Sequence, residues 1–176
     1  MKTLLVVVDM QQDFVHGPLG TAEARAILPG VAERVRRAEK EGASLACTMD
    51  THQPDYLQTQ EGRKLPVLHC VEGTEGWTLC PGLAAPLAGA KMFRKPTFGS
   101  LELGEYVKNE DFDRVELVGV CTGICVLSNA ALIRACAPEV EIFVNSALCA
   151  CVSPESHQTA LRAMQLLQVT VTENAA

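Results

Sequence analysis

Side chains that can do chemistry follow four short apolar runs of the chain. An apolar run of this length, bounded by polar turns, is typical of a strand that is buried on both faces of a parallel sheet. Ligands bind beyond the carboxyl ends of the strands in open α/β sheets, so we expect these side chains to share one crevice. An acid, a metal-binding pair, a lysine and a cysteine together indicate a hydrolase with a thiolate nucleophile. The runs are residues 3–8 before Asp9, 44–49 before Asp50 and His52, 91–94 before Lys95, and 115–120 before a short turn that leads to Cys125.

Cys125 lies in the first turn of a helix predicted over residues 123–136. The free N–H groups and the helix dipole at that place favour a thiolate, and the same N–H groups could bind a developing oxyanion. Asp9 either works in a site or caps a turn, because an apolar strand offers a carboxylate no other partner. Lys95 beside these groups would keep the thiolate and the carboxylate ionised. Each residue alone could equally be a core cysteine, a turn cap or a surface lysine, and only their joint occurrence at strand ends indicates catalysis.

A second group of residues is suited to binding a metal ion. Asp50 and His52 lie on the same side of an extended segment, and His69 follows 17 residues after His52. One aspartate and two histidines are a common ligand set for zinc, iron or manganese with positions left open for water. Glu61 in the same loop is a possible fourth ligand. Ordinary loop histidines with satisfied hydrogen bonds are the alternative interpretation.

Eight cysteines are distributed along the chain without a CxxC pair. Disulfides are rare in a reducing compartment, where most cysteines behave as small buried hydrophobes. Cys121 and Cys125 are four residues apart, but no second pair of thiolates completes a tetrahedral zinc site, so we expect none of that kind. The cysteines are Cys47, Cys70, Cys80, Cys121, Cys125, Cys136, Cys149 and Cys151.

Strand-like and helix-like segments alternate along the chain, which predicts an α/β fold. We expect a doubly wound, Rossmann-like sandwich of three layers around a mainly parallel, six-stranded sheet. Residues 50–90 are mostly irregular, and so long an irregular stretch is more often functional than idle. The predicted strands are 3–9, 44–49, 91–94, 114–120, 141–144 and 168–172, and the predicted helices are 29–41, 101–109, 123–136 and 154–167.

Length and charge restrict the class of protein further. A chain of 176 residues with 48% hydrophobic residues fits one domain over 1–176 with a substantial core. The net charge of −6 argues against nucleic acid and against an anionic membrane surface as partners. No apolar run approaches the ~18 residues that a bilayer requires, and no secretory segment is recognisable. We therefore expect a cytoplasmic protein.

The motifs together resemble those of the isochorismatase-like cysteine hydrolases, and the nicotinamidase branch in particular. The resemblance extends over nearly the whole chain, and the set of motifs is specific in combination although no single one is. The segments that carry it are 9–14 (DMQQDF), 50–52 (DTH), 69–74 (HCVEGT), 95–98 (KPTF) and 119–126 (GVCTGICV).

The resemblance implies roles for individual residues. It implies a catalytic triad, a divalent metal, and an oxyanion hole whose N–H groups follow a cis peptide bond between Val120 and Cys121. It also implies a homo-oligomer, for which the alanine-rich stretch 83–90 could provide a contact. The implied residues are Asp9, Lys95 and Cys125 for the triad, Asp50, His52, His69 and Glu61 for the metal, the N–H groups of Cys121 and Cys125 for the oxyanion, and Phe14 and Val120 for the substrate pocket.

Three positions depart from the nicotinamidase pattern. Gln58 stands where a second histidine is usual, six residues after His52, which bears on the number of metal ligands. Residues 65–68 (LPVL) replace a tryptophan that would form a wall for a pyridine ring. Ser146 replaces an acidic residue, which we expect to affect packing alone.

We predict that the protein hydrolyses a small carboxamide of the nicotinamide type to the acid and ammonia, through a thioester intermediate. The expected metal is zinc, with iron or manganese as alternatives. Another small amide, a carbamate or a ureido compound is the alternative within the same chemistry. A flavodoxin-like binding module is a non-catalytic alternative, although the segment 17–20 lacks a G-x-G-x-x-G pattern. A protein that stores metal or buffers thiols is the other, given the eight cysteines.

Overall fold

Six parallel strands form the single sheet of the computed structural model, which describes residues 1–173. The strand order is β3-β2-β1-β4-β5-β6, and each neighbouring pair runs in the same direction. The chain thus starts in the middle of the sheet and builds outward on both sides. The strands are β1 (Thr3–Val8), β2 (Ser44–Asp50), β3 (Lys91–Lys95), β4 (Arg114–Val120), β5 (Glu141–Ala150) and β6 (Thr170–Thr172).

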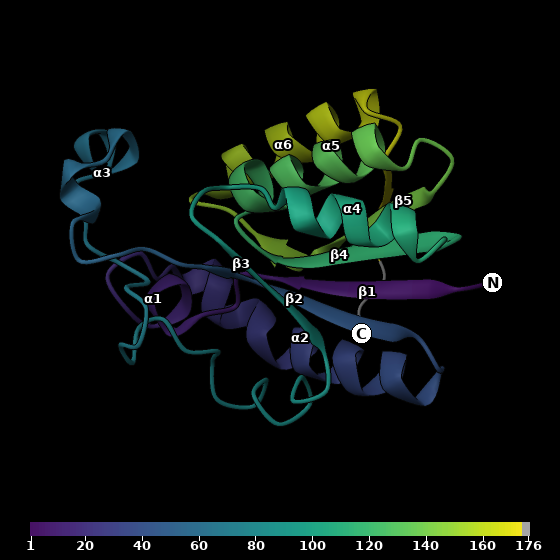
Figure 1. Ribbon diagram of the computed structural model, residues 1–176, viewed down its shortest axis with the longest axis horizontal. Coiled ribbons are helices and arrows are strands. Elements are labelled where there is room, and N and C mark those ends of the chain that lie inside the picture. The colour runs from purple at the N-terminus through teal and green to yellow at the C-terminus, as the bar shows by residue number, and fades with distance from the viewer. Residues whose placement is uncertain (174–176) are drawn as a thin grey trace.

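Helices cover both faces of the sheet, as Figure 1 shows. The long helix α2 (Ala22–Lys40) packs on one face, and α4 (Leu101–Asn109), α5 (Leu127–Cys136) and α6 (Pro154–Leu166) lie together on the other. Two short helices, α1 (Gln12–Val15) and α3 (Gln60–Lys64), follow β1 and β2. The predicted three-layer α/β fold is confirmed, and the sheet is wholly rather than mainly parallel.

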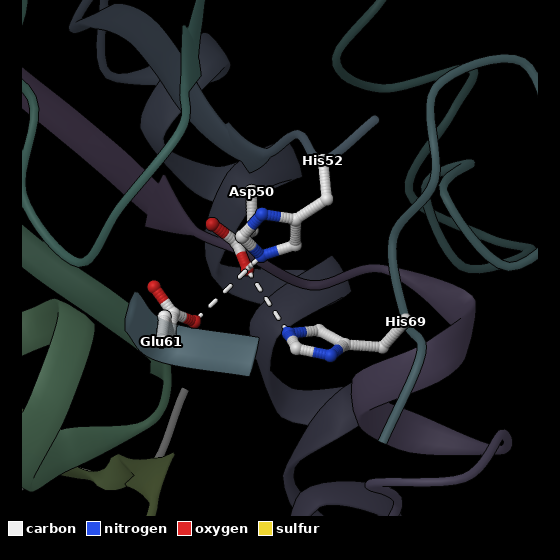
Figure 2. Close-up of side chains that lie close together, drawn as sticks. All are labelled: Asp50, His52, Glu61 and His69. Atoms are coloured by element: carbon white, nitrogen blue, oxygen red, sulfur yellow. Dashed lines mark hydrogen bonds and ion pairs between the residues drawn. The ribbon is translucent and has the colours of Figure 1, made fainter. Parts of the chain in front are cut away.

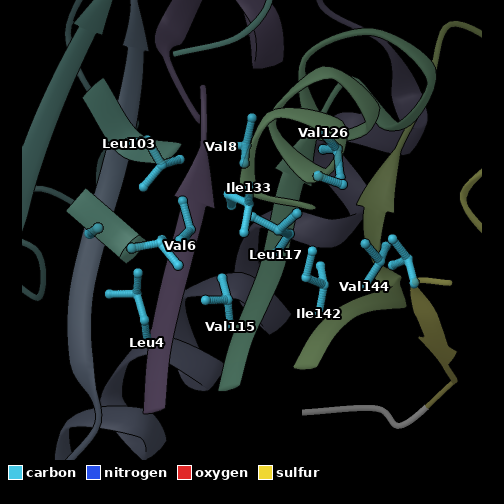
Figure 3. Packing of buried hydrophobic residues seen from close by; sticks show 14 of the residues in the cluster. Leu4, Val6, Val8, Leu103, Val115, Leu117, Val126, Ile133, Ile142 and Val144 are labelled. Atoms are coloured by element: carbon cyan, nitrogen blue, oxygen red, sulfur yellow. The ribbon is translucent and has the colours of Figure 1, made fainter. Parts of the chain in front are cut away.

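The central strand β1 shows why its sequence is a continuous apolar run. Leu4, Val6 and Val8 point to the face under α4 and α5, where they pack with residues such as Leu103 and Ile133 (Figure 3). The alternate residues of β1 belong to the cluster that packs beneath α2. Because helices cover both faces of the sheet, the residues of β1 need not alternate between apolar and polar.

Two predicted helix boundaries are corrected by the structure. The helix predicted from residue 29 begins at Ala22, where the Thr21 hydroxyl caps it by accepting the Ala24 N–H at 3.0 Å. Pro29 therefore lies inside this helix and not at its start. The helix predicted from residue 123 instead opens with a π-helical turn, η2 (Thr122–Val126), before α5 begins.

The long stretch between β2 and β3 is largely irregular, as predicted, with a 3-10 turn, η1 (Tyr56–Gln58), and α3 inside it. Within residues 1–173, no helix has both the length and the apolar character that crossing a bilayer requires.

The strands β1 and β4 approach each other closely where they end. Gly119 has φ +116°, and a Cβ at this position would lie 2.2 Å from the Val8 carbonyl oxygen. Only glycine fits there, because a side chain would meet both a rare backbone conformation and the neighbouring strand. This contact brings the end of β1 beside the turn that follows β4.

Candidate active site

Asp9, Lys95 and Cys125 meet at the carboxyl edge of the sheet, although they come from three different strand ends. Asp9 follows β1 with φ +49°, Lys95 ends β3, and Cys125 lies in η2 after β4. The Lys95 ammonium nitrogen lies 2.6 Å from Asp9 Oδ2 and 3.6 Å from Cys125 Sγ. All three residues are buried. The long lysine side chain spans β2, which separates β3 from β1.

Further hydrogen bonds fix the charged groups in place. The Thr48 hydroxyl donates to Asp9 Oδ1 at 2.6 Å. The Lys95 ammonium donates to the Thr97 carbonyl at 3.0 Å and to Asp50 Oδ1 at 3.3 Å. The single ammonium group is therefore shared by two carboxylates, one carbonyl and one sulfur, which orients it without access to bulk water.

Burial and charge shift the pKa values of these groups. Burial raises the pKa of the Asp9 carboxyl more than the neighbouring Lys95 lowers it. Burial would lower the pKa of Lys95, but Asp9, Cys125 and Asp50 raise it, so the ammonium stays charged. Burial and the Asp9 charge raise the pKa of the Cys125 thiol. At rest, then, the sulfur carries its proton, and Lys95 carries the positive charge.

The turn that carries Cys125 is held by backbone and side-chain contacts. The peptide bond between Val120 and Cys121 is cis, as the resemblance implied. The Cys121 carbonyl accepts the Ile124 and Val126 N–H groups at 3.0 and 3.1 Å, which closes the π-helical turn.

Asn129 ties this turn to the loop after β3. Its amide nitrogen donates to the Cys125 carbonyl at 2.8 Å, and its oxygen accepts the Ser100 N–H at 3.0 Å. Asn129 is fully buried, and it was not among the residues predicted from the sequence. A polar residue inside a predicted apolar helix was the one available signal.

Four residues form a group that could hold a metal ion, shown in Figure 2. Asp50, His52, Glu61 and His69 each offer one ligand atom, and these atoms all lie within 4.8 Å of one another. Asp50 Oδ2 lies 3.0 Å from His52 Nε2 and 3.5 Å from His69 Nε2. His52 Nε2 lies 3.7 Å from Glu61 Oε1. All four residues were predicted from the sequence as metal ligands.

The surroundings of this group suit a cation. Burial would raise the pKa of Asp50, but hydrogen bonds from both histidines and the charge of Lys95 lower it, so the carboxylate stays ionised. The His69 Nδ1 faces the Val67 carbonyl at 2.7 Å, which leaves Nε2 free for a metal. Gln11 holds the Asp50 backbone by two hydrogen bonds, of 2.7 and 2.9 Å. Two imidazoles and two carboxylates are a donor set that fits zinc, iron or manganese.

A cavity of about 240 Å³ opens between the two groups of residues. Its lining is mainly apolar, with Cys125 on one side and the metal-site residues on another. Leu65 is part of the lining, so an aliphatic side chain stands near the place where the nicotinamidase pattern has tryptophan. Trp77 does not replace it, because its Nε1 donates to Thr51 outside this lining. The lining includes Phe14, Val120, Phe98, Ile124, Cys121, Asp50, Glu61 and His69.

Comparisons with known sequences and structures found related proteins. A family model described as isochorismatase domain matches residues 3–176. No curated protein sequence gives a significant match. Solved structures do match. A pyrazinamidase/nicotinamidase from Streptococcus mutans is 28% identical, with a TM-score of 0.85 over 97% of this chain and 99% of that one.

Two further solved structures that are similar to this chain are named as two different enzymes. A pyrazinamidase of Pyrococcus horikoshii in complex with zinc is 25% identical, with a TM-score of 0.80 over 99% of this chain and 100% of that one. An N-carbamoylsarcosine amidase from Thermoplasma acidophilum is 25% identical, with a TM-score of 0.81 over 98% of this chain and 96% of that one. With a family model matched along almost its entire length, the chain belongs to the isochorismatase family.

Proposed function

We propose that the chain hydrolyses the C–N bond of a small carboxamide, of the nicotinamide type, with Cys125 as the nucleophile. The observation that carries this proposal is the position of Lys95, whose ammonium contacts both Asp9 at 2.6 Å and Cys125 at 3.6 Å. A buried thiol beside a buried base and a fixed cation is suited to nucleophilic catalysis. The apolar cavity beside the sulfur provides the space for the substrate.

The first half of the reaction transfers the acyl group to sulfur. Asp9 accepts the proton of Cys125, and Lys95 stabilises the thiolate that results. This transfer creates no net charge in the buried site, because the negative charge moves from oxygen to sulfur beside the same ammonium. The thiolate attacks the carboxamide carbon, and the N–H groups of Cys121 and Cys125 stabilise the oxyanion. Protonated Asp9 then gives its proton to the leaving ammonia, which leaves a thioester.

The second half returns the enzyme to its starting state. Asp9 accepts a proton from a water molecule as that water attacks the thioester carbon. The acid product leaves, and the Cys125 sulfur recovers its proton. Lys95 again balances the charge that passes between the sulfur and the carboxylate.

We propose that zinc binds at Asp50, His52, Glu61 and His69, although iron and manganese suit the same donors. The zinc-bound pyrazinamidase of Pyrococcus horikoshii supports this choice. A bound divalent cation would supply Lewis-acid chemistry that orients the substrate through a ring nitrogen or a bound water. Asp50 contributes Oδ2 to this group while its Oδ1 faces Lys95 at 3.3 Å, so one carboxylate couples substrate orientation to the nucleophile.

A ureido or carbamate compound is a second candidate substrate. The similarity to an N-carbamoylsarcosine amidase favours it, as does Leu65 in the cavity wall in place of an aromatic ring. Its carbonyl carbon also carries an amino group that leaves as ammonia, so the same steps apply.

Ammonia release from nicotinamide, pyrazinamide and N-carbamoylsarcosine tests the proposal. Cys125→Ala and Asp9→Asn are expected to lower turnover by on the order of 10⁴-fold or more, as for other nucleophile and base variants. Cys47→Ala, at a buried cysteine of β2, serves as the matched control and should stay within about threefold of the unsubstituted protein. Turnover retained by Cys125→Ala would remove the cysteine mechanism. Light scattering on the same samples tests the expected homo-oligomer.

A further inference from the structure

Two thiols beside the candidate active site have no part in the proposed reaction. The sulfur atoms of Cys121 and Cys151 lie 3.1 Å apart, at the ends of β4 and β5. Cys121 is partly exposed and Cys151 is buried. The proposed reaction uses the backbone N–H of Cys121 and leaves both side chains without a role.

The backbone places these cysteines where a disulfide can form. Val120 pairs with Ala150 in the parallel ladder, and the two cysteines are the residues that directly follow these strand ends. Neighbouring strands lie about 4.7–4.9 Å apart, which falls within the Cα separations of about 4.4–6.8 Å found in disulfides. The sulfur atoms would need to approach by about 1 Å to reach bonding distance.

The pair also faces the cavity. Cys121, Cys151 and Cys125 all line it, so the two thiols form part of the wall that a substrate would contact. A covalent bond between them would pull on the residue that follows the cis peptide bond and would move its N–H group. That N–H is one of the two proposed oxyanion donors, so bond formation at this wall would act directly on catalysis.

We propose that Cys121 and Cys151 form a modification site that closes to a disulfide on exposure to a small disulfide oxidant and thereby stops turnover. The Cys121 thiolate attacks one sulfur of the oxidant, which releases one thiol and leaves a mixed disulfide. The Cys151 thiolate then attacks the Cys121 sulfur and releases the second thiol. Two cysteine thiols are oxidised and one oxidant disulfide is reduced to two thiols, so atoms and electrons balance.

Cys121 is the attacking sulfur because it is partly exposed, whereas Cys151 is buried. Burial and the contact with Cys151 raise the pKa of the Cys121 thiol to about 12. The exchange is therefore slow at neutral pH and faster under alkaline conditions, because the thiolate is the species that attacks.

The site is tested by oxidising the full chain with hydroxyethyl disulfide at about pH 9. The protein is then denatured, its free thiols are alkylated, and its peptides are mapped by mass spectrometry. We expect a link between Cys121 and Cys151 with the other six of the eight cysteines alkylated. Cys151→Ser should prevent the link. Cys136→Ser, at the other partly exposed thiol, should leave it intact. Eight alkylated cysteines, or a link through any other pair, would overturn the site.

The effect on turnover rests on the proposed function and is measured separately. Oxidation should lower amide hydrolysis by on the order of 100-fold, the loss that follows removal of an oxyanion donor, and dithiothreitol should restore it. Cys121→Ser, which lacks the attacking sulfur, should have the same rate of hydrolysis before and after the treatment. A mapped link with unchanged turnover would overturn the switch. A reduced protein without amidase activity would refute the proposed function, while the peptide map would still decide whether the site exists.

Discussion

Lys95 offers a quantitative test of how the candidate active site is held together. Its buried ammonium contacts Asp9 at 2.6 Å and Asp50 at 3.3 Å. Lys95→Met would leave the Asp9 carboxylate buried with the Thr48 hydroxyl at 2.6 Å and no cation. Removing one partner of a buried ion pair costs about 3–5 kcal/mol, so the free energy of unfolding should fall by that amount.

The companion variant Asp9→Asn is expected to be milder. Lys95 would keep its contacts with Asp50 and with the Thr97 carbonyl at 3.0 Å, so only one charged hydrogen bond is lost. Such a bond is worth about 1.5–3 kcal/mol. The double variant Lys95→Met/Asp9→Asn leaves no unpaired carboxylate at position 9. Its loss in free energy of unfolding should therefore be smaller than the sum of the two single losses by about 2–3 kcal/mol.

Urea unfolding followed by the fluorescence of Trp77, the single tryptophan, measures all three variants against the unsubstituted protein. A chelator in every sample keeps the metal-site residues in the same state. If the two single losses add up to the loss of the double variant within about 0.5 kcal/mol, the two residues do not interact, and the predicted coupling is refuted.

The same variants predict a dependence on pH. Burial already raises the pKa of Asp9 above its ordinary value, and loss of the Lys95 cation would raise it further. An acid whose pKa is higher in the folded state stabilises the fold at low pH and loses this contribution as pH rises through that pKa. The stability gap between Lys95→Met and the double variant should therefore widen as pH rises above about 4, the ordinary pKa of aspartate. A gap that is independent of pH would contradict this assignment.

Two further predictions concern the metal and the sheet. Asp50→Ala should weaken zinc binding, measured by calorimetry, by more than about 100-fold, because even the residues that only contact a metal ligand contribute about 10–100-fold to metal affinity. Cys125→Ala should bind zinc as the unsubstituted protein does. Equal zinc affinities of the two variants would remove Asp50 from the ligand set. Gly119→Ala should lower the free energy of unfolding by about 2–4 kcal/mol, because its Cβ would lie 2.2 Å from the Val8 carbonyl and its φ is +116°. Gly89→Ala, where a Cβ meets nothing within 4 Å, should change it by less than about 0.5 kcal/mol, and similar losses for both variants would contradict the packing argument.

The strands and the meeting of the candidate residues could be predicted because both follow from local pattern. A strand covered on both faces needs apolar residues throughout, so β1 and β4 stand out in the sequence. The carboxyl ends of parallel strands share one edge, so Asp9, Lys95 and Cys125 could be expected at the same edge of the sheet. The predicted start of α2 was wrong by seven residues, because the helix extends through Pro29 back to its cap at Thr21.

Other features depend on partners that are distant in the sequence, and no local pattern reveals them. Asn129 reaches Ser100 across 29 positions, and its polar side chain gives no indication of which backbone group it meets. Thr122 faces His157 Nδ1 at 2.8 Å across 35 positions, although each residue alone is unremarkable. The close approach of Cys121 and Cys151 follows from the register of β4 against β5, which composition and periodicity do not determine.

The position of β1 in the sheet has a consequence for biosynthesis. This first strand has β2 on one side and β4 on the other, so its second neighbour is translated more than a hundred residues later. The four candidate metal ligands and Lys95 all emerge from the ribosome before β4 does, whereas Cys125, the proposed nucleophile, follows it. The proposed site therefore cannot be complete until the strand that fills the centre of the sheet has been made. A chain that is truncated ahead of β4 should accordingly lack acyl-transfer activity.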